Sequence, residues 1–291
     1  MEFFLGVDCG ATKNAATVIN SSGKIVFKTT GEGSIFKIQK DFSKRLYEFL
    51  APIIKKYKIS SACFGVAGVD SKKDYKEAYK VIKNKFRLKK IKVLNDVEII
   101  LPTVTSGPGV AAIAGTGSKF FATDGTRTAY ASGMSHILSD EGGAYDMGVR
   151  ILRAAVRSYD GRGEKTLLEK LVMKKAGIKS MQELNDVIYK KFDKALIASF
   201  APLAEISAKR WDNVSKQILR DISQEIINGI AAVALRTGIE KREINIVMIG
   251  GVFNSKLILN RVKKGVVRYI PRAHIRVITD SSLGAAKLAM R

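Results

Sequence analysis

Short apolar runs alternate with amphipathic stretches along the first hundred residues of the chain. Continuous runs of Val, Ile, Phe and Ala are typical of buried β-strands. Such runs occur at 3–7, 15–19, 25–29, 62–66 and 91–94. Apolar positions at helical spacing predict helices at 41–56 and 74–86. Because strands alternate with helices, we predict an α/β fold built on a parallel sheet with right-handed crossovers.

The same order of elements returns in the second half of the chain. Strands are predicted at 110–114, 120–123, 129–132, 244–249 and 275–279. Helices are predicted at 143–158, 216–237 and 281–290, and residues 160–213 are helical in character without a site signature. An offset of 106 residues pairs GVDCGATK at 6–13 with AIAGTGSK at 112–119. This duplication predicts two related domains that face each other across a cleft.

The segment GVDCGATK concentrates residues that favour an anion. Gly10 lets a ligand approach the backbone closely, and exposed amides, the Thr12 hydroxyl and the Lys13 ammonium attract negative charge. The Asp8 carboxylate would repel that anion unless a cation lay between them. The segment therefore predicts half of a metal–polyphosphate site. A plain glycine-containing hairpin is the alternative, which the second copy makes less favoured.

Composition narrows the class of protein. A chain of 291 residues, 46% of them hydrophobic, can form two globular domains. No apolar run is long enough to predict a membrane span, and the chain enters a strand at once, so no signal peptide is expected. Cys9 and Cys63 lie in different predicted strands without a CxxC or Cys/His cluster. This argues against structural zinc and iron–sulfur sites and favours buried thiols in a cytoplasmic protein.

The formal net charge of +23 raises the question of a nucleic-acid partner. Lysines crowd residues 55–92, but they alternate with apolar residues at helical spacing, which is typical of the solvated face of a helix. Neither an aromatic stacking pattern nor an arginine-rich run accompanies them. We therefore do not expect nucleic-acid binding to be the main role.

Taken together, these motifs resemble the actin-like ATPase superfamily of sugar kinases, actin and heat-shock ATPases. Within it the chain resembles the BadF/BadG/BcrA/BcrD ATPase family, in particular its N-acetylglucosamine kinase and archaeal ATP-dependent hexokinase branch. The resemblance rests on the order and spacing of GVDCGATK, NDVE, AIAGTGSK, SHILSDEGGAYDMG, VMIGGVF and SSLGAAKLA. It implies two domains of ribonuclease-H-like topology, at 1–112 and 113–280, the first completed by the C-terminal helix 281–291.

The resemblance also implies roles for single residues in an ATP- and Mg²⁺-dependent phosphoryl transfer to a sugar hydroxyl. Asp8 would orient Mg²⁺ through water, and Asp96 would accept the proton of the sugar hydroxyl. The phosphates would be bound by Gly10, Thr12, Lys13, Thr116, Gly117 and Ser118. Gly250 and Gly251 would let adenosine lie close to the backbone, and Asp140 would bind sugar hydroxyls. This agrees with the chemistry, because phosphoryl transfer needs mainly positioning and charge neutralisation.

The chain departs from the family pattern mainly near the sugar. Ala11 stands where the first phosphate loop usually has glycine, and the glycine–tryptophan pair before the acidic segment is missing. Ser34 replaces an asparagine common in the sugar-contact loop, and Ile35 and Phe36 follow it. Ser34 and His136 remain candidate sugar contacts, His136 as part of the wall. Since a hydroxyl offers fewer hydrogen bonds than an amide, we expect weak binding of simple hexoses and a preference for an apolar substituent such as N-acetyl.

Alternatives stay open at this stage. Asp96 could instead cap a helix that begins there, and Asp140 could belong to a turn. The second hypothesis for the protein is an ATPase that drives a partner, of the dehydratase-activator type. Members of that type carry cluster-binding cysteines between subunits, and Cys9 and Cys63 are not placed for this.

A third hypothesis is a nucleotide-binding regulator without turnover. The presence of both Asp8 and Asp96 argues against it, because a pure binder needs no base. We expect a small-molecule sugar as the acceptor, a homodimer, and a cytoplasmic location without membrane attachment.

Overall fold

The computed structural model describes residues 1–291 except 1, 11, 35, 37–40 and 191. Ala11 and Ile35, two of the departures from the family pattern, lie outside the described residues. The chain divides into two compact units. The first unit comprises residues 1–107 and 278–291, and the second comprises residues 108–277. The boundary precedes the strand at 109–114, whereas the sequence analysis placed it inside that strand, after residue 112.

The first unit is a five-stranded sheet in the order β3-β2-β1-β4-β5. Its strands are β1 (Phe3–Cys9), β2 (Lys13–Asn20), β3 (Ile25–Glu32), β4 (Ile59–Val66) and β5 (Lys90–Asn95). The central strand β1 pairs antiparallel with β2 and parallel with β4, and the crossover that leads to β4 leaves from β3 through the helix at Phe42–Lys56. A short 3₁₀ turn, η1, follows at Leu101–Thr103.

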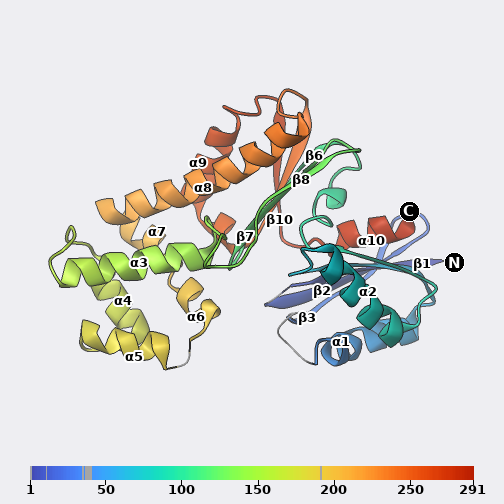
Figure 1. The fold of residues 1–291 in the computed structure, drawn as a ribbon, viewed down its shortest axis with the longest axis horizontal. Helices are drawn as coiled ribbons and strands as arrows, with labels where there is room; N and C mark the ends of the chain where they lie inside the picture. Colours follow the sequence, from blue (N-terminus) through green and yellow to red (C-terminus); the bar gives the residue numbers. More distant parts are fainter. Residues whose placement is uncertain (1, 11, 35, 37–40, 191) are drawn as a thin grey trace. The chain divides into compact units, whose positions relative to one another are not determined.

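Helices cover both faces of this sheet (Figure 1). The core on one face joins Leu5 and Val7 to α1 (Phe42–Lys56) and α2 (Lys72–Phe86). The core on the other face joins Phe4 to the alanines of α10 (Ser282–Met290). Alternate residues of β1 therefore face opposite helices, as the period of two along a strand requires. The C-terminal helix completes the N-terminal unit.

The second unit repeats this topology. Its strands are β6 (Gly109–Ala114), β7 (Ser118–Thr123), β8 (Thr128–Ser132), β9 (Ile244–Ile249) and β10 (Ala273–Ile278). They form a five-stranded sheet in the order β10-β9-β6-β7-β8. Read from the other edge, the third, second, first, fourth and fifth strands of the unit follow one another, which is the order in the first unit. The internal duplication predicted from the 106-residue offset is therefore present in the fold.

Helices make up most of the second unit (Figure 1). They are α3 (Ala144–Tyr159), α4 (Leu168–Ala176), α5 (Leu184–Tyr189), α6 (Lys194–Ser199), α7 (Pro202–Ala208), α8 (Asn213–Thr237) and α9 (Lys256–Val266), with 3₁₀ turns η2 (Met181–Glu183) and η3 (Gly251–Asn254). The long helix α8 packs on β6, β7 and β8 and on α3, α7 and α9. Its apolar residues Ile222, Ile226 and Ile230 are buried in the core of the unit.

The ends of α8 show what the apolar pattern could and could not locate. Gly238 adopts the left-handed conformation and closes the helix, as predicted. The start lies three residues earlier than the predicted position 216, because Asp212 caps the helix by accepting a hydrogen bond from the backbone of Ser215. None of the helices in the described part of the chain is both long and apolar enough to cross a bilayer.

Candidate active site

Asp8 occupies the strand end at which the predicted metal–polyphosphate site begins. It lies two residues beyond Gly6 and therefore on the same face of β1. Gly6 lets α10 approach closely, because a Cβ there would lie 2.1 Å from the backbone nitrogen of Ala286. This approach brings Ser281 beside Asp8, and the Ser281 hydroxyl donates a hydrogen bond to the Asp8 carboxylate.

The surroundings of Asp8 disfavour its charged form. Burial raises the pKa of the Asp8 carboxyl to about 7, against the hydrogen bond from Ser281. The negative charges of Asp96 and Asp280 raise this pKa further, while Lys13 lowers it. A buried carboxylate with other carboxylates nearby gains from an added cation. The described residues hold no group of three or more His, Cys, Asp or Glu side chains fit to ligate a metal directly.

Three consecutive residues tie the start of α10 to three strands. Asp280 forms an ion pair with Lys28 of β3 at 2.8 Å, Ser281 bonds to Asp8 of β1, and Ser282 shares a 2.7 Å hydrogen bond with Thr17 of β2. Burial alone would raise the pKa of Asp280, but the bond to Lys28 and those to Ser282 outweigh it and lower the pKa. We call residues 280–282 the C-terminal strap. Because the strap is bonded to β1, β2 and β3, these three strands fix the position of Ser281.

The loop between β1 and β2 keeps its predicted anion-binding side chains at the surface. The Gly10 N–H donates to the Lys13 carbonyl at 3.2 Å, and a Cβ on Gly10 would lie 2.7 Å from that carbonyl oxygen. Thr12 and Lys13 are exposed. Glycine is thus needed to close the turn, and the hydroxyl and the ammonium are accessible to a ligand.

Asp96 follows β5 and is half-buried. No α-helix begins there, because residues 96–100 form turns; the reading of Asp96 as the cap of such a helix is therefore wrong. The neighbouring Asn95 organises the turn instead. Its amide donates to the Val69 carbonyl at 2.8 Å and to Asp70 at 3.1 Å, and its oxygen accepts from the backbone of Val97 at 3.1 Å. Since Asp96 raises the pKa of Asp8, the two carboxylates are close enough to interact.

Ser34 is fully buried. Its hydroxyl shares hydrogen bonds with the side-chain amide of Asn14, at 3.1 and 3.3 Å, and its backbone N–H donates to the Gly10 carbonyl at 3.1 Å. Asn14 also donates to the Glu32 carbonyl at 2.7 Å. These contacts engage the Ser34 hydroxyl within the protein, so they favour a role in holding the first phosphate loop. A sugar contact by Ser34 stays a prediction.

In the second unit, the loop after β6 is held against the start of α3. Backbone N–H groups of Ala144 and Tyr145 donate to the carbonyls of Gly115 and Thr116 at 2.8 and 2.9 Å. The Ser118 hydroxyl bonds to Ser132 at 2.8 Å and to a backbone carbonyl at 2.6 Å, so this hydroxyl is already engaged. Thr116 and Gly117 are partly exposed, which leaves their backbone accessible to an anion.

Gly250 and Gly251 differ in what surrounds them. Gly250 has φ +127°, and a Cβ there would lie 2.2 Å from the carbonyl oxygen of Ala114. The loop after β9 therefore packs directly on the loop after β6. A Cβ on Gly251 would meet nothing within 4 Å, and the same holds for Gly115. Open space thus lies next to both loops, as a bound nucleotide would require.

Asp140 is packed closely against the second phosphate loop. A Cβ on Gly117 would lie 2.6 Å from its carboxylate, so a larger residue there would have to displace the Asp140 side chain. The Asp140 N–H donates to the Ser132 hydroxyl at 3.2 Å. Asp140 has φ +72°, and Ser132 and Ser135 also have positive φ. Strained backbone of this kind clusters at functional sites.

Asp140 and His136 line the same cavity, which has a volume of ≈ 550 Å³. Burial raises the pKa of the Asp140 carboxyl, although Lys194 lowers it. Burial and the nearby charge of Lys194 lower the pKa of His136. The His136 ring lies edge-on to Tyr145, with ring centroids 4.9 Å apart. The structure therefore brings together the two residues predicted for the sugar side in this unit. We call this space the sugar-side cavity.

The sequence analysis missed several residues of these sites. Ser281 and Asn95 position the carboxylates of the first unit, and Lys194 and Arg153 add positive charge at the sugar-side cavity. The serines at the start of α10 and the asparagine at the end of β5 are residue types common at helix starts and turns, which is the signal that could have found them. Lys194 and Arg153 had no sequence signal, because they lie on helices outside the motifs that the sequence analysis singled out.

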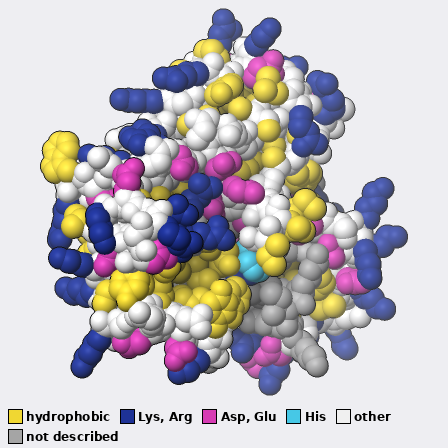
Figure 2. All heavy atoms as spheres, turned by 60° about the vertical axis from the view of Figure 1, so that its left-hand side comes forward, with side chains coloured by type: hydrophobic (Ala, Val, Ile, Leu, Met, Phe, Trp, Pro, Cys, Tyr) yellow, Lys and Arg dark blue, Asp and Glu magenta, His cyan; other side chains and the backbone are white. Residues whose placement is uncertain are grey.

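The basic charge of the chain is spread over its surface. Lys and Arg side chains are scattered across the visible face, with Asp and Glu among them (Figure 2). On α2, Lys72, Lys73, Lys76 and Lys80 are exposed, as expected for the solvated side of an amphipathic helix. This distribution agrees with the interpretation of the 55–92 lysines as a solvated helix face.

Comparisons with known proteins agree with the motifs. The model of the BadF/BadG/BcrA/BcrD ATPase family matches residues 5–289. An N-acetylmuramic acid/N-acetylglucosamine kinase from Clostridium acetobutylicum is 29% identical over 99% of this chain and 98% of its own length. An N-acetyl-D-glucosamine kinase from Dictyostelium discoideum is 30% identical over 99% of this chain and 98% of its own length.

A solved structure shows the same fold. It is that of a candidate N-acetylglucosamine kinase from Chromobacterium violaceum, which superimposes with a TM-score of 0.79 at 21% identity and covers 99% of both chains. At this identity the likeness concerns the fold, and it extends over both units.

Proposed function

The chain belongs to the BadF/BadG/BcrA/BcrD ATPase family, and we propose that it transfers the γ-phosphate of ATP to a hydroxyl group of an N-acetylhexosamine. Both curated relatives are kinases of N-acetylated amino sugars and match nearly the whole chain. The observation that carries the proposal is the pair of interacting carboxylates, Asp8 and Asp96, at strand ends of one sheet.

ATP and Mg²⁺ have distinct anchors in this proposal. Thr12 and Lys13 bind phosphate oxygens from the exposed first loop, and the backbone of Thr116 and Gly117 does so from the second. The open space at Gly251 takes the adenosine. Asp8 would hold Mg²⁺ through water, and the ion would supply positive charge between this carboxylate and the phosphates.

Asp96 is the proposed general base. A hydroxyl that attacks the γ-phosphate becomes acidic as the bond forms, and a carboxylate within hydrogen-bond reach accepts its proton. Asn95 fixes the turn that carries Asp96 through three hydrogen bonds. The turn that carries Asp96 is therefore held in place before substrate arrives, which reduces the entropic cost of the reaction.

The acceptor sugar is proposed to bind in the sugar-side cavity. Asp140 accepts hydrogen bonds from sugar hydroxyls, and the His136 and Tyr145 rings form an aromatic wall for the ring and its acetyl group. Ser34 holds the loop at 31–34 to Asn14 and Gly10 and acts by positioning that loop. The expectation that the two domains face each other across a cleft stays a prediction.

The dehydratase-activator alternative is disfavoured by the thiols. Cys9 and Cys63 are free and buried within the first unit, as predicted. Burial raises the pKa of Cys63 to about 12 and that of Cys9 well above its usual range. Neither thiol is accessible as a thiolate ligand for a cluster between subunits.

A coupled ADP-release assay tests the proposed function. The purified protein is assayed with ATP and Mg²⁺, with and without N-acetylglucosamine, N-acetylmannosamine, glucose and galactose. We expect ADP release that requires an N-acetylhexosamine and is strongly reduced in Asp96→Asn. Sugar-independent hydrolysis would favour the partner-driving ATPase, and nucleotide binding without turnover would favour the regulator.

Three further expectations belong to the same proposal. We propose a homodimer, which light scattering of the purified protein tests directly. We propose that the protein works in the cytoplasm on a small-molecule sugar. We also propose that the basic surface has no nucleic-acid role; a filter-binding assay at physiological salt should then show only weak, sequence-independent retention of DNA or RNA.

A further inference from the structure

The segment that joins β8 to α3 has an unusual backbone. Ser132, Ser135 and Asp140 have positive φ, at +60°, +74° and +72°. This conformation costs free energy in a residue with a Cβ, and it persists only where the surrounding structure fixes it. The contacts of these three residues therefore indicate what the segment holds in place.

The Ser132 hydroxyl is the centre of these contacts. It shares a hydrogen bond with the Ser118 hydroxyl at 2.8 Å, and it accepts from the Ser139 hydroxyl at 3.0 Å and from the Asp140 N–H at 3.2 Å. The Ser118 hydroxyl donates its own proton to the Glu141 carbonyl at 2.6 Å. Because a hydroxyl has one proton and two lone pairs, Ser132 must donate to Ser118, and its hydrogen-bonding capacity is then complete.

This network joins two parts of the proposed site. Ser118 ends the second phosphate loop (residues 115–118) and begins β7, while Asp140 lines the sugar-side cavity. The Asp140 carboxylate also lies directly against that loop, since a Cβ on Gly117 would come within 2.6 Å of it. Burial raises the pKa of the Asp140 carboxyl, and a hydrogen bond from the Ser118 backbone is among the contacts that lower it. The carboxylate proposed to bind sugar hydroxyls is therefore bonded to the loop proposed to bind phosphate.

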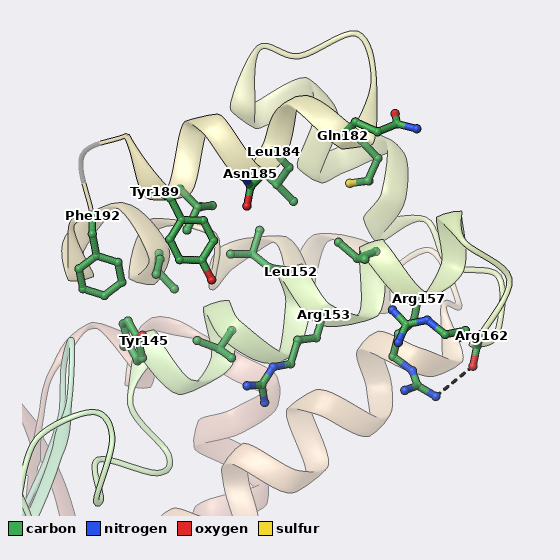
Figure 3. Close-up of a pocket in the computed structure, with 15 residues that line it drawn as sticks. Tyr145, Leu152, Arg153, Arg157, Arg162, Gln182, Leu184, Asn185, Tyr189 and Phe192 are labelled. Atoms are coloured by element: carbon green, nitrogen blue, oxygen red, sulfur yellow. Dashed lines mark hydrogen bonds between the residues drawn. The ribbon is translucent and has the colours of Figure 1, made fainter.

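The wall of the sugar-side cavity is tied to the same loop. The Tyr145 N–H donates to the Thr116 carbonyl at 2.9 Å, and Tyr145 lines the cavity beside His136. Figure 3 shows Tyr145 at the start of α3, near Phe192, and both residues also line a second cavity along that helix. Two links thus connect the phosphate loop to the sugar side. One runs through backbone atoms at Tyr145, and the other runs through the Ser132 side chain, which a substitution can remove.

We propose that Ser132 is a positioning residue that couples the two substrates, so that nucleotide on the second phosphate loop strengthens acceptor binding at Asp140 and the acceptor strengthens nucleotide binding. The inference rests on the proposed function and deepens it by naming a coupling within the same site.

The coupling follows from shared ordering. Phosphate oxygens on the backbone of 116 and 117 hold the Ser118 hydroxyl and N–H in place, and Ser132 passes this constraint to the N–H of Asp140. The second ligand then meets groups that are already ordered, so it binds at a lower entropic cost. Linkage requires the factor to be the same in both directions.

The coupling is measured as a ratio of two dissociation constants. Isothermal titration calorimetry gives the Kd of N-acetylglucosamine with and without a non-hydrolysable ATP analogue and Mg²⁺. For the unaltered protein we expect the analogue to lower this Kd about five- to tenfold, at the lower end of couplings between sites. The Kd of the analogue should fall by the same factor when the sugar is present.

Ser132→Gly removes the hydroxyl without adding strain, because glycine adopts the left-handed conformation readily. The variant should stay folded and bind the analogue alone as the unaltered protein does, but its coupling ratio should lie within about twofold of one. Ser132→Ala keeps the Cβ and should lose the coupling as well. Ser139→Ala removes one donor to Ser132 and leaves its bonds to Ser118 and Asp140, so this variant should keep the coupling.

Ser135→Gly is the matched control for the backbone. Ser135 also has positive φ, three positions after Ser132, but its hydroxyl accepts from Lys194 at 3.0 Å and shares a 3.2 Å hydrogen bond with the His136 ring. The same strain is relieved, while the network between the phosphate loop and Asp140 is left intact. This variant should therefore keep the coupling ratio of the unaltered protein.

Three results would overturn the inference. They are a ratio of one in the unaltered protein, an unchanged ratio in either variant of Ser132, and an equal loss in Ser135→Gly, which would assign the effect to the backbone. ADP release tests the proposed function separately. If N-acetylglucosamine is phosphorylated while the ratio is one, the proposed function stands and the inference fails. If no N-acetylhexosamine is phosphorylated, the proposed function itself fails.

Discussion

Asp8 lies near the end of β1 in the first unit, whereas Ala114 takes the matching position of β6 in the second, 106 residues further along. The two sheets have the same strand order, yet one carries carboxylates at its strand ends and the other carries glycine loops. The glycines differ as well, because Gly10 is crowded by the Lys13 carbonyl and Gly115 faces open space. One topology thus supports two kinds of chemistry.

The difference shows which chemistry needs which support. A buried carboxylate costs free energy unless neighbours hold it, and the first unit provides the C-terminal strap and the Asn95 turn for this purpose. A site for phosphate or adenosine needs accessible backbone. The second unit provides it with glycine at positions 115 and 251, where open space adjoins the backbone. Substitutions in the two units should therefore affect different properties of the protein.

The largest effect is expected at Asp96. Asp96→Asn keeps the size of the side chain but cannot accept the proton, so kcat should fall by about two to four orders of magnitude. Nucleotide affinity and thermal stability should stay close to those of the unaltered protein, which equilibrium binding of an ATP analogue and thermal unfolding would check. A loss confined to KM for the sugar would mean that Asp96 binds substrate without transferring a proton.

Asp8→Ala should lower kcat by about two to three orders of magnitude, the range seen when one preorganised electrostatic group is removed. The same substitution should not lower the melting temperature, because it removes a carboxylate that burial already disfavours. Kinetics at saturating ATP and Mg²⁺ and a melting curve test both statements. Near-normal kcat would show that the first loop is the structural hairpin considered at the outset.

The adjacent glycines of the second unit provide a matched pair. Gly250→Ala should destabilise the protein by about 1–3 kcal/mol or more, because its φ is +127° and a Cβ would clash with the Ala114 carbonyl. Gly251→Ala should leave stability unchanged and raise KM for ATP about tenfold, since its methyl group enters open space. If Gly251→Ala changes neither quantity, adenosine does not approach this loop.

Ser281→Ala tests the C-terminal strap with a smaller effect. It removes the hydrogen bond that orients the Asp8 carboxylate, so the Mg²⁺ concentration for half-maximal activity should rise about three- to tenfold. Ser22→Ala, on an exposed turn of the same unit, is the control and should change nothing. An unchanged Mg²⁺ dependence in Ser281→Ala would show that Asp8 keeps its orientation without the strap.

The smallest effect concerns pH. Because burial raises the pKa of Asp140, its carboxylate should become protonated at a pH above the usual carboxyl range. Protonation removes the acceptor for sugar hydroxyls. As pH falls, kcat/KM for the sugar should therefore decline a few-fold at a pH where KM for ATP is still unchanged.

The effect of Asp140 on folding stability should have the opposite pH dependence: its contribution should fall as pH rises, whereas activity falls as pH decreases. A carboxyl whose pKa is higher in the folded protein than in the unfolded chain contributes stability below its unfolded pKa. It loses that contribution as pH rises through the folded pKa. Asp140→Asn should therefore be at least as stable at neutral pH as the unaltered protein. A lower melting temperature at pH 7 would contradict the assigned direction.

The apolar pattern predicted most elements because each buries a continuous face or stripe. Strand β9 was placed at its observed bounds, and α1 and α2 within two residues, since their patterns are long and regular. The region 160–213 was recognised as helical, but its division into α4 to α7 was not found. Short helices depend on packing more than on their own periodicity, so their ends carry a weak signal.

The candidate site divides in the same way. Residues at a strand end or on the loop that directly follows it, such as Asp8, Asp96 and Gly117, could be selected from the sequence because glycine, acid and strand occur together along the chain. Ser34 could also be selected, but its burial against Asn14 could not be foreseen, because that contact depends on how β2 and β3 pair.

The sequence by itself determined the fold class, the duplication, the family and the residue types at the strand ends, because local periodicity and motif spacing encode all four. The tertiary structure alone decided which distant residues reach those ends. Ser281 contacts Asp8 although the two are 273 positions apart. The direction of α3 brings Arg153 to the cavity that Asp140 also lines. Such contacts follow from the packing of α10 on Gly6 and of α3 against the loop after β6, and packing of this kind has no period that a sequence could display.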